Sequence, residues 1–121
     1  MTYVRFEAAL PNRQGRFPGV FGLVNGLGKD GRLSAEQESF RRAGNDWYDA
    51  NFTNPSDVDP EVYLRPGARA WFKVTSPHLI DRVAGYLAIL DAHAVAWRRL
   101  ESDDPGLIVY EDADQVVVVP R

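Results

Sequence analysis

The sequence predicts an α+β domain in which a mostly antiparallel sheet of about four strands packs in two layers against three to four helices. Alternating apolar residues form a strand pattern at the start of the chain, and three more strand-like stretches close it. Amphipathic helical patterns occupy the residues between them. The 121 residues are 45% apolar and 26% charged, which is typical of one globular domain. We therefore expect one domain over residues 1–121, in the order β-α-α-(α)-α-β-β-β.

The first half of the chain begins with a strand that the alternation of residues 3–10 predicts. A helix follows from Pro18 and ends in the glycine-rich residues 28–31. Ser34 and Gln37 have the spacing of a capping box, so the next helix begins at residue 35 and continues to about residue 50. Its apolar stripe is expected to contain Phe40, Ala43 and Trp47.

The second half begins with turn-forming residues over 51–60 and two predicted helical turns at 60–64 and 68–73. Ser76 and Pro77 then start an amphipathic helix that ends near His93. Strand patterns follow at 95–101, 107–111 and 115–119, separated by short turns. Short turns join antiparallel neighbours, so these three strands should form a C-terminal meander beside the N-terminal strand.

The composition excludes several classes of protein. Without cysteine the chain has no disulfide, thiolate metal site or cysteine nucleophile. No apolar run reaches the roughly 18 residues of a membrane span, and the charged N-terminus lacks a signal-peptide core. We therefore expect a cytoplasmic protein without membrane contact. The net charge of −3 and the pI of about 5.3 disfavour binding to nucleic acid.

Charge is distributed in blocks along the chain. Residues 1–42 carry a net charge of +3, residues 43–64 carry −5, residues 65–99 carry +4 and residues 100–121 carry −5. Our first interpretation is that positive and negative blocks face each other in the fold. The alternative is that they remain available to a partner.

Residues 43–64, which we call the acidic-aromatic segment, contain five acidic and four aromatic side chains and no lysine or arginine. Aromatic faces beside carboxylates suit a cationic or polar ligand. Adjacent aromatic residues on a helix point about 100° apart, so one member of each adjacent pair should lie near the surface. The sequence therefore nominates these ligand- or partner-binding residues: Trp47, Tyr48, Asp49, Asn51, Tyr63 and Trp71.

No complete catalytic or metal-binding motif is present. Residues 26–31 match G-x-G-x-x-G in letters, but a predicted helix precedes them where a dinucleotide site needs a strand. His78 and His93 lie at opposite ends of one predicted helix and cannot share a metal ion. We predict no catalytic residue, metal ligand or cofactor from these patterns.

Three functional interpretations remain. The leading one is a small non-catalytic binding or accessory domain of a bacterial cytoplasm, similar in role to an immunity protein or antitoxin. It would bind a basic protein or a small polar or cationic molecule through residues 45–63. The second is a small enzyme that uses Asp46 or Asp49 with Tyr48 in a pocket between helices and sheet. The third is a homodimer paired around Trp71 and Phe72.

Overall fold

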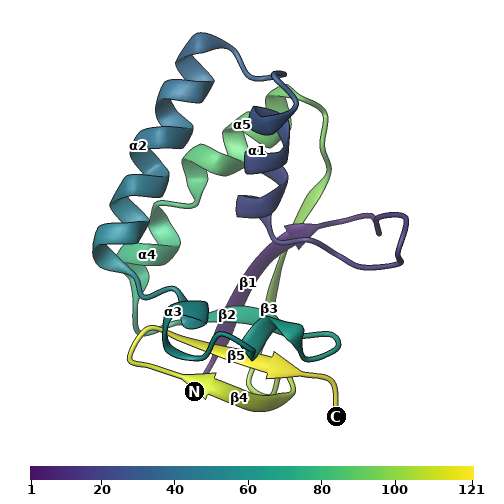
Figure 1. Cartoon of the computed structure of the whole chain (residues 1–121), viewed down its shortest axis with the longest axis vertical. Helices are drawn as coiled ribbons and strands as arrows, with labels where there is room; N and C mark the ends of the chain where they lie inside the picture. The colour runs from purple at the N-terminus through teal and green to yellow at the C-terminus, as the bar shows by residue number, and fades with distance from the viewer.

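The computed structural model describes all residues from 1 to 121 and has the predicted α+β class. One antiparallel sheet contains five strands in the spatial order β3-β1-β2-β5-β4. Their bounds are Tyr3–Ala8 (β1), Arg69–Lys73 (β2), Trp97–Ser102 (β3), Leu107–Glu111 (β4) and Gln115–Val119 (β5). β1 and β3 run at a steep angle to the other three strands, so the sheet is strongly twisted (Figure 1).

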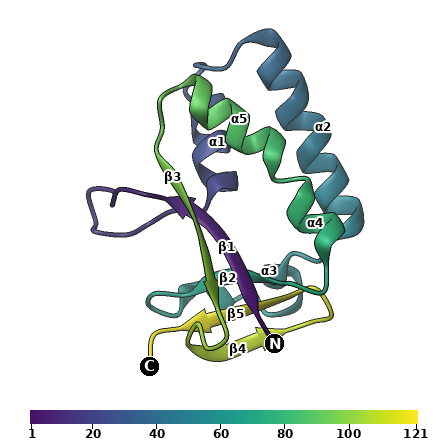
Figure 2. The ribbon, with the colours of Figure 1, turned by 180° about the vertical axis from the view of Figure 1, so that it is seen from behind.

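Figures 1 and 2 show α1, α2, α4 and α5 together beyond one end of this sheet. Their bounds are Val20–Lys29 (α1), Ala35–Asn51 (α2), Pro77–Asp81 (α4) and Ala84–Ala92 (α5). Two short elements, α3 (Pro55–Val58) and the 3-10 turn η1 (Val62–Leu64), lie against β2 and β5 instead (Figure 1). No helix has both the length and the apolar character that crossing a bilayer requires.

Two apolar clusters lie on opposite faces of the sheet. The larger one joins Val4 and Phe6 of β1 and Phe72 of β2 to buried residues of the helices, among them Tyr48 and Tyr86. The smaller one consists of Tyr3, Trp71, Val116 and Val118, with Leu100 of β3 packed against it. The sheet is thus buried on both faces, which explains the run of four valines in β5.

Strand β2 corrects the prediction of a helical turn at residues 68–73. Trp71 and Phe72 are both buried, each 7% exposed, because neighbouring strand residues point to opposite faces and each face has its own cluster. The expectation that one of this pair lies near the surface is therefore wrong. So short an apolar run does not reveal its period from sequence alone.

The C-terminal strands also pair differently from the predicted meander. β4 pairs with β5, but β3 pairs with β1 along its whole length and lies at the other edge of the sheet. The turn after Ser102 therefore connects two strands that are not hydrogen-bonded neighbours. Turn residues indicate where a strand ends, but they do not fix which strand it pairs with.

Two helical details also differ from expectation. The helix predicted from Ser76 to His93 is divided into α4 and α5 by Arg82 and Val83, and Ser76 makes no side-chain cap. On α2 the buried residues are Gly44 and Tyr48, while Trp47 is only half-buried. The stripe thus lies one residue further along the helix than predicted.

Candidate functional site

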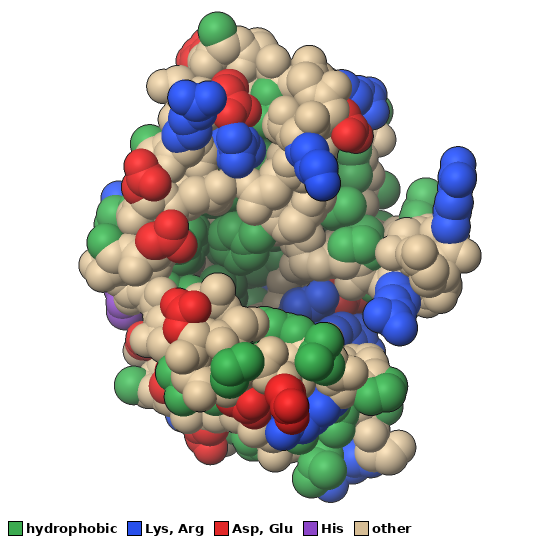
Figure 3. Space-filling view, in the orientation of Figure 1, with side chains coloured by type: hydrophobic (Ala, Val, Ile, Leu, Met, Phe, Trp, Pro, Cys, Tyr) green, Lys and Arg blue, Asp and Glu red, His purple; other side chains and the backbone are tan.

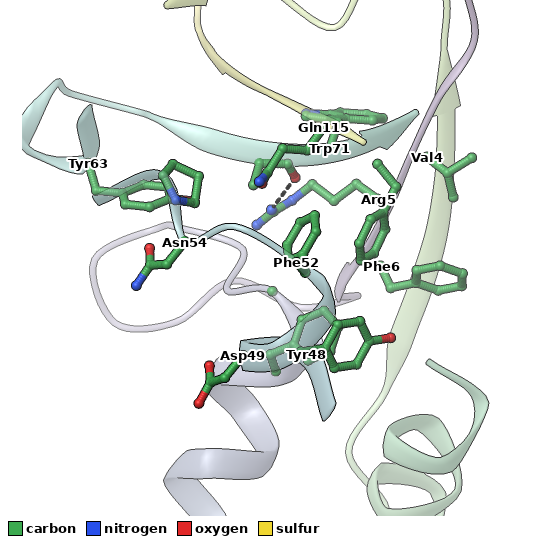
Figure 4. A pocket seen from close by; sticks show the side chains of 15 residues that line it. Val4, Arg5, Phe6, Tyr48, Asp49, Phe52, Asn54, Tyr63, Trp71 and Gln115 are labelled. Carbon is green, nitrogen blue, oxygen red and sulfur yellow. Dashed lines mark hydrogen bonds between the residues drawn. The ribbon is translucent and has the colours of Figure 1, made fainter. Parts of the chain in front are cut away.

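A cavity of about 250 Å³ lies where the end of α2 and the start of β1 approach β2 and β5. Figure 4 shows Asp49 and Tyr48 at one end, Tyr63 and Asn54 on one side, and Val4 and Phe6 on the other. We call it the central cavity. Nine of its fifteen lining residues are hydrophobic, so its polar groups are few and can fix the orientation of a ligand.

The central cavity exists because β1 and β2 separate. Their pairing covers only Tyr3 with Lys73 and Val4 with Phe72. Beyond Val4 the side chain of Arg5 fills the space between the strands, and its Nη1 donates to the carbonyl oxygen of Ala70 at 2.9 Å. The Arg5 side chain thus takes the place of the next backbone hydrogen bonds between β1 and β2.

Glu7 holds Arg5 in that position. The Arg5 Nε donates to Glu7 Oε1 at 2.8 Å, and the Arg5 side chain is only 11% exposed. Glu7 is fully buried and also accepts hydrogen bonds from Arg98, its cross-strand neighbour on β3, at 2.6 and 3.0 Å. Burial raises the pKa of Glu7, but the hydrogen bonds from Arg98 and Arg5 outweigh it and keep the pKa below its ordinary value.

Gln115 lines the central cavity and has an unsatisfied acceptor. The residue is fully buried, and its Nε2 donates to Thr53 O at 2.7 Å and to Asp112 Oδ2 at 3.0 Å. Both partners only accept, so the amide cannot be reversed. Its Oε1 consequently has no donor within the chain. A buried acceptor without a partner costs about 1–3 kcal/mol, which a hydrogen bond from a donor outside the chain would offset.

Four of the six nominated residues border the central cavity: Tyr48, Asp49, Tyr63 and Trp71. The indole of Trp71 packs into the cluster on the opposite face of the sheet. Asn51 is exposed and borders an open hollow next to Asp49. Trp47 lies outside the lining, where the Arg82 guanidinium is 4.0 Å from its ring centroid. The structure thus brings four of the nominated residues to one cavity and places Asn51 and Trp47 outside its lining.

Tyr48 has a structural role. Its hydroxyl donates to the carbonyl oxygen of Leu79 at 2.7 Å, and the side chain packs against Phe21 and Tyr86. Burial raises the pKa of Tyr48 well above its usual range. The hydroxyl proton is therefore held by the Leu79 carbonyl, and the structure shows no hydrogen bond from Tyr48 to Asp46 or Asp49. Trp71 and Phe72, the residues around which we expected a homodimer to pair, are each 7% exposed.

The acidic side chains of the segment remain largely unpaired. Of its five carboxylates only Asp59 forms an ion pair, with Arg65 at 3.0 Å. The expectation that charge blocks face each other holds between residues 65–99 and 100–121, where Lys73 pairs with Glu111 and Arg99 with Glu101. The expectation is wrong for the acidic-aromatic segment, apart from Asp59. The unpaired carboxylates are Asp46, Asp49, Asp57 and Glu61, and all four are exposed.

The sequence did not reveal the polar groups that shape the central cavity. Arg5, Glu7 and Gln115 lie in strands and have no distinctive motif around them. The one available signal was that Arg5 and Glu7 share one side of a strand whose face is otherwise apolar, since Tyr3 is buried there. No group of three His, Asp or Glu side chains in the structure could hold a metal ion.

The fold and cavity define a small α+β protein with a ligand-sized hollow at the junction of its helices and sheet. No family model, curated protein or solved structure matches the chain significantly.

Proposed function

We propose that this protein is a non-catalytic binding domain that accepts a cationic, N–H-donating group in its central cavity. The group belongs to a basic protein partner or to a small molecule. The observation that carries the proposal is the unpaired Asp49 carboxylate at an aromatic-lined cavity, which Gln115, with its unpartnered Oε1, also lines.

Electrostatics favour a cation at this end of the molecule. Asp49 borders the central cavity without a counter-ion, and Asp46 and Asp57 are exposed nearby in the same segment. Figure 3 shows red side chains on the left of the central hollow and hydrophobic ones within it. Arg5 also borders the cavity, but its charge is balanced by Glu7 and its other nitrogens donate to Ala70 and Phe17 carbonyls.

The size of the cavity restricts the ligand. Pockets for drug-sized molecules measure roughly 300–1,000 Å³. The central cavity, at about 250 Å³, is smaller, which favours one side chain or a small molecule over a large cofactor. Phe52 and Tyr63 offer aromatic surface to a flat cation, and the exposed Asp49 carboxylate offers an acceptor.

The test compares two probes of nearly equal shape, benzamidinium and neutral benzamide, by isothermal titration calorimetry. We expect the wild type to prefer benzamidinium. Asp49→Asn should weaken that preference about five- to tenfold, as expected for about 1–1.4 kcal/mol. Asp46→Asn is the matched control, because Asp46 is an exposed, unpaired acid on the same helix outside the cavity lining.

Three outcomes would contradict the proposal: equal affinity for the two probes, no binding of benzamidinium, or equal effects of the two substitutions. A ¹⁵N correlation spectrum gives an independent readout. Binding in the cavity should shift the side-chain amide signals of Gln115, and those of the exposed Asn51 should move less.

A further inference from the structure

A second cavity of about 370 Å³ lies on the far side of Arg5, and we call it the arginine cavity. Four arginines and no acidic residue line it, although the whole chain has a net charge of −3. The four are Arg5, Arg16, Arg65 and Arg69. Figure 3 shows blue side chains on the right of the hollow, opposite the red ones.

The fold does not neutralise this positive charge. The lining arginines reach only two carboxylates, Glu7 and Asp59, and Glu7 is shared with Arg98. The arginines that line the cavity thus exceed these two carboxylates by two charges. Bringing such charges together is unfavourable unless an anion compensates them.

Two of these arginines keep most of their donors free. Arg69 makes one contact, from Nη1 to Glu7 Oε1 at a long 3.4 Å, and its side chain is 40% exposed. Arg16 has no side-chain hydrogen bond or ion pair within the chain and is exposed. A guanidinium has five N–H donors in a planar fork, which matches the oxygens of a phosphate or carboxylate.

The loop that presents Arg16 is held by its own hydrogen bonds. Asn12 N donates to Arg16 O at 2.8 Å, and Asn12 Oδ1 accepts from Arg16 N at 3.0 Å. Gly15 closes the turn with a φ of 73°, a backbone conformation that glycine adopts without strain. The backbone at Arg16 is therefore positioned before any ligand arrives, which reduces the ordering cost of binding.

The geometry points to an anion site here, and we infer that the arginine cavity binds a small phosphate-bearing molecule. Its phosphate would sit between Arg16 and Arg69, the two lining arginines that keep most of their donors free. A phosphate group suits the site better than a single carboxylate, because it carries close to two charges at neutral pH and offers three oxygens to the guanidinium forks. This site is separate from the proposed cation site, although Arg5 and Tyr63 border both cavities.

Calorimetry with pyrophosphate tests the inference, with sodium chloride at matched ionic strength as the background. We expect the wild type to bind pyrophosphate, and Arg16→Gln to weaken binding about tenfold, which corresponds to one charge-assisted hydrogen bond of about 1.4 kcal/mol. The double variant Arg16→Gln/Arg69→Gln should weaken it further. Arg32→Gln is the control, since Arg32 is exposed, has no ion pair and lies in the α1–α2 loop, distant from the sheet (Figure 1).

The single variant keeps the test interpretable, because Arg16 has no partner whose loss would disturb folding. Absence of pyrophosphate binding by the wild type would overturn the inference, as would an equal loss in Arg32→Gln. Binding of a single-stranded oligonucleotide without binding of pyrophosphate would also overturn it and would indicate a nucleic-acid surface instead. Neither Arg16→Gln nor the double variant should change the preference for benzamidinium. One proposal can therefore fail while the other holds.

Discussion

Replacing Glu7 with glutamine tests the central electrostatic feature of the fold. The substitution keeps the shape of the side chain and removes its charge. Glu7 is fully buried, and Arg5 beside it is 11% exposed, so Arg5 would remain buried without a counter-ion. Arg69 and Arg98 are each 40% exposed and can be solvated by water instead.

The loss of the Arg5–Glu7 pair therefore determines how far Glu7→Gln lowers the free energy of unfolding. Removing one partner of a buried ion pair costs about 3–5 kcal/mol, whereas exposed pairs contribute about 0–1 kcal/mol. For a chain of 121 residues that loss corresponds to a fall in Tm of roughly 12–20 °C. Urea unfolding followed by tryptophan fluorescence measures the free energy of unfolding directly.

Glu101→Gln is the matched control, because Glu101 pairs with Arg99 on the surface and both side chains are about half exposed. Its free energy of unfolding should stay within about 1 kcal/mol of the wild type. If Glu7→Gln is equally mild, the buried pair does not stabilise the junction of β1 and β2, and our account of Arg5 is wrong.

The pH dependence gives a second check on Glu7. Its pKa in the folded protein lies below the ordinary value of 4.5. Ionised Glu7 thus stabilises the fold above pH 4.5, and this stabilisation is lost as the pH falls through the folded pKa. The stability difference between wild type and Glu7→Gln should shrink as the pH falls below 4.5. A constant difference down to acid unfolding would contradict this explanation.

Three further substitutions test local features, each measured as a change in the free energy of unfolding in urea. Tyr48→Phe removes the donor to the Leu79 carbonyl and should cost about 1–1.5 kcal/mol; no loss would show that this hydrogen bond is dispensable. Ser34→Ala removes the α2 capping box and should cost about 1 kcal/mol, and Thr at this position should restore most of it. Gly106→Ala should destabilise by at least about 1 kcal/mol, because φ is 150° and a Cβ would lie 2.5 Å from the Val119 carbonyl oxygen; an unchanged Tm would refute that.

The candidate site was predictable only where its signal was local. Five acids without a basic residue mark the segment that borders the central cavity, and Asp49 and Tyr63 were nominated from it. Tyr48 was nominated too, but its role is structural, because the orientation of α2 turns its ring into the core. Gln115 was not nominated: it lies 52 positions after Tyr63, and nothing near it in sequence shows that its amide oxygen would lack a donor.

The sequence by itself determined the α+β class, the capping box at Ser34, the first strand and the last two strands. These depend on side-chain alternation, helical spacing and turn residues that act within a few positions of the chain. The tertiary structure alone decided that residues 69–73 form a strand, that β3 pairs with β1, and that Glu7 meets Arg98. Glu7 and Arg98 lie 91 positions apart, and a contact of that kind depends on which strands become neighbours, which no local pattern encodes.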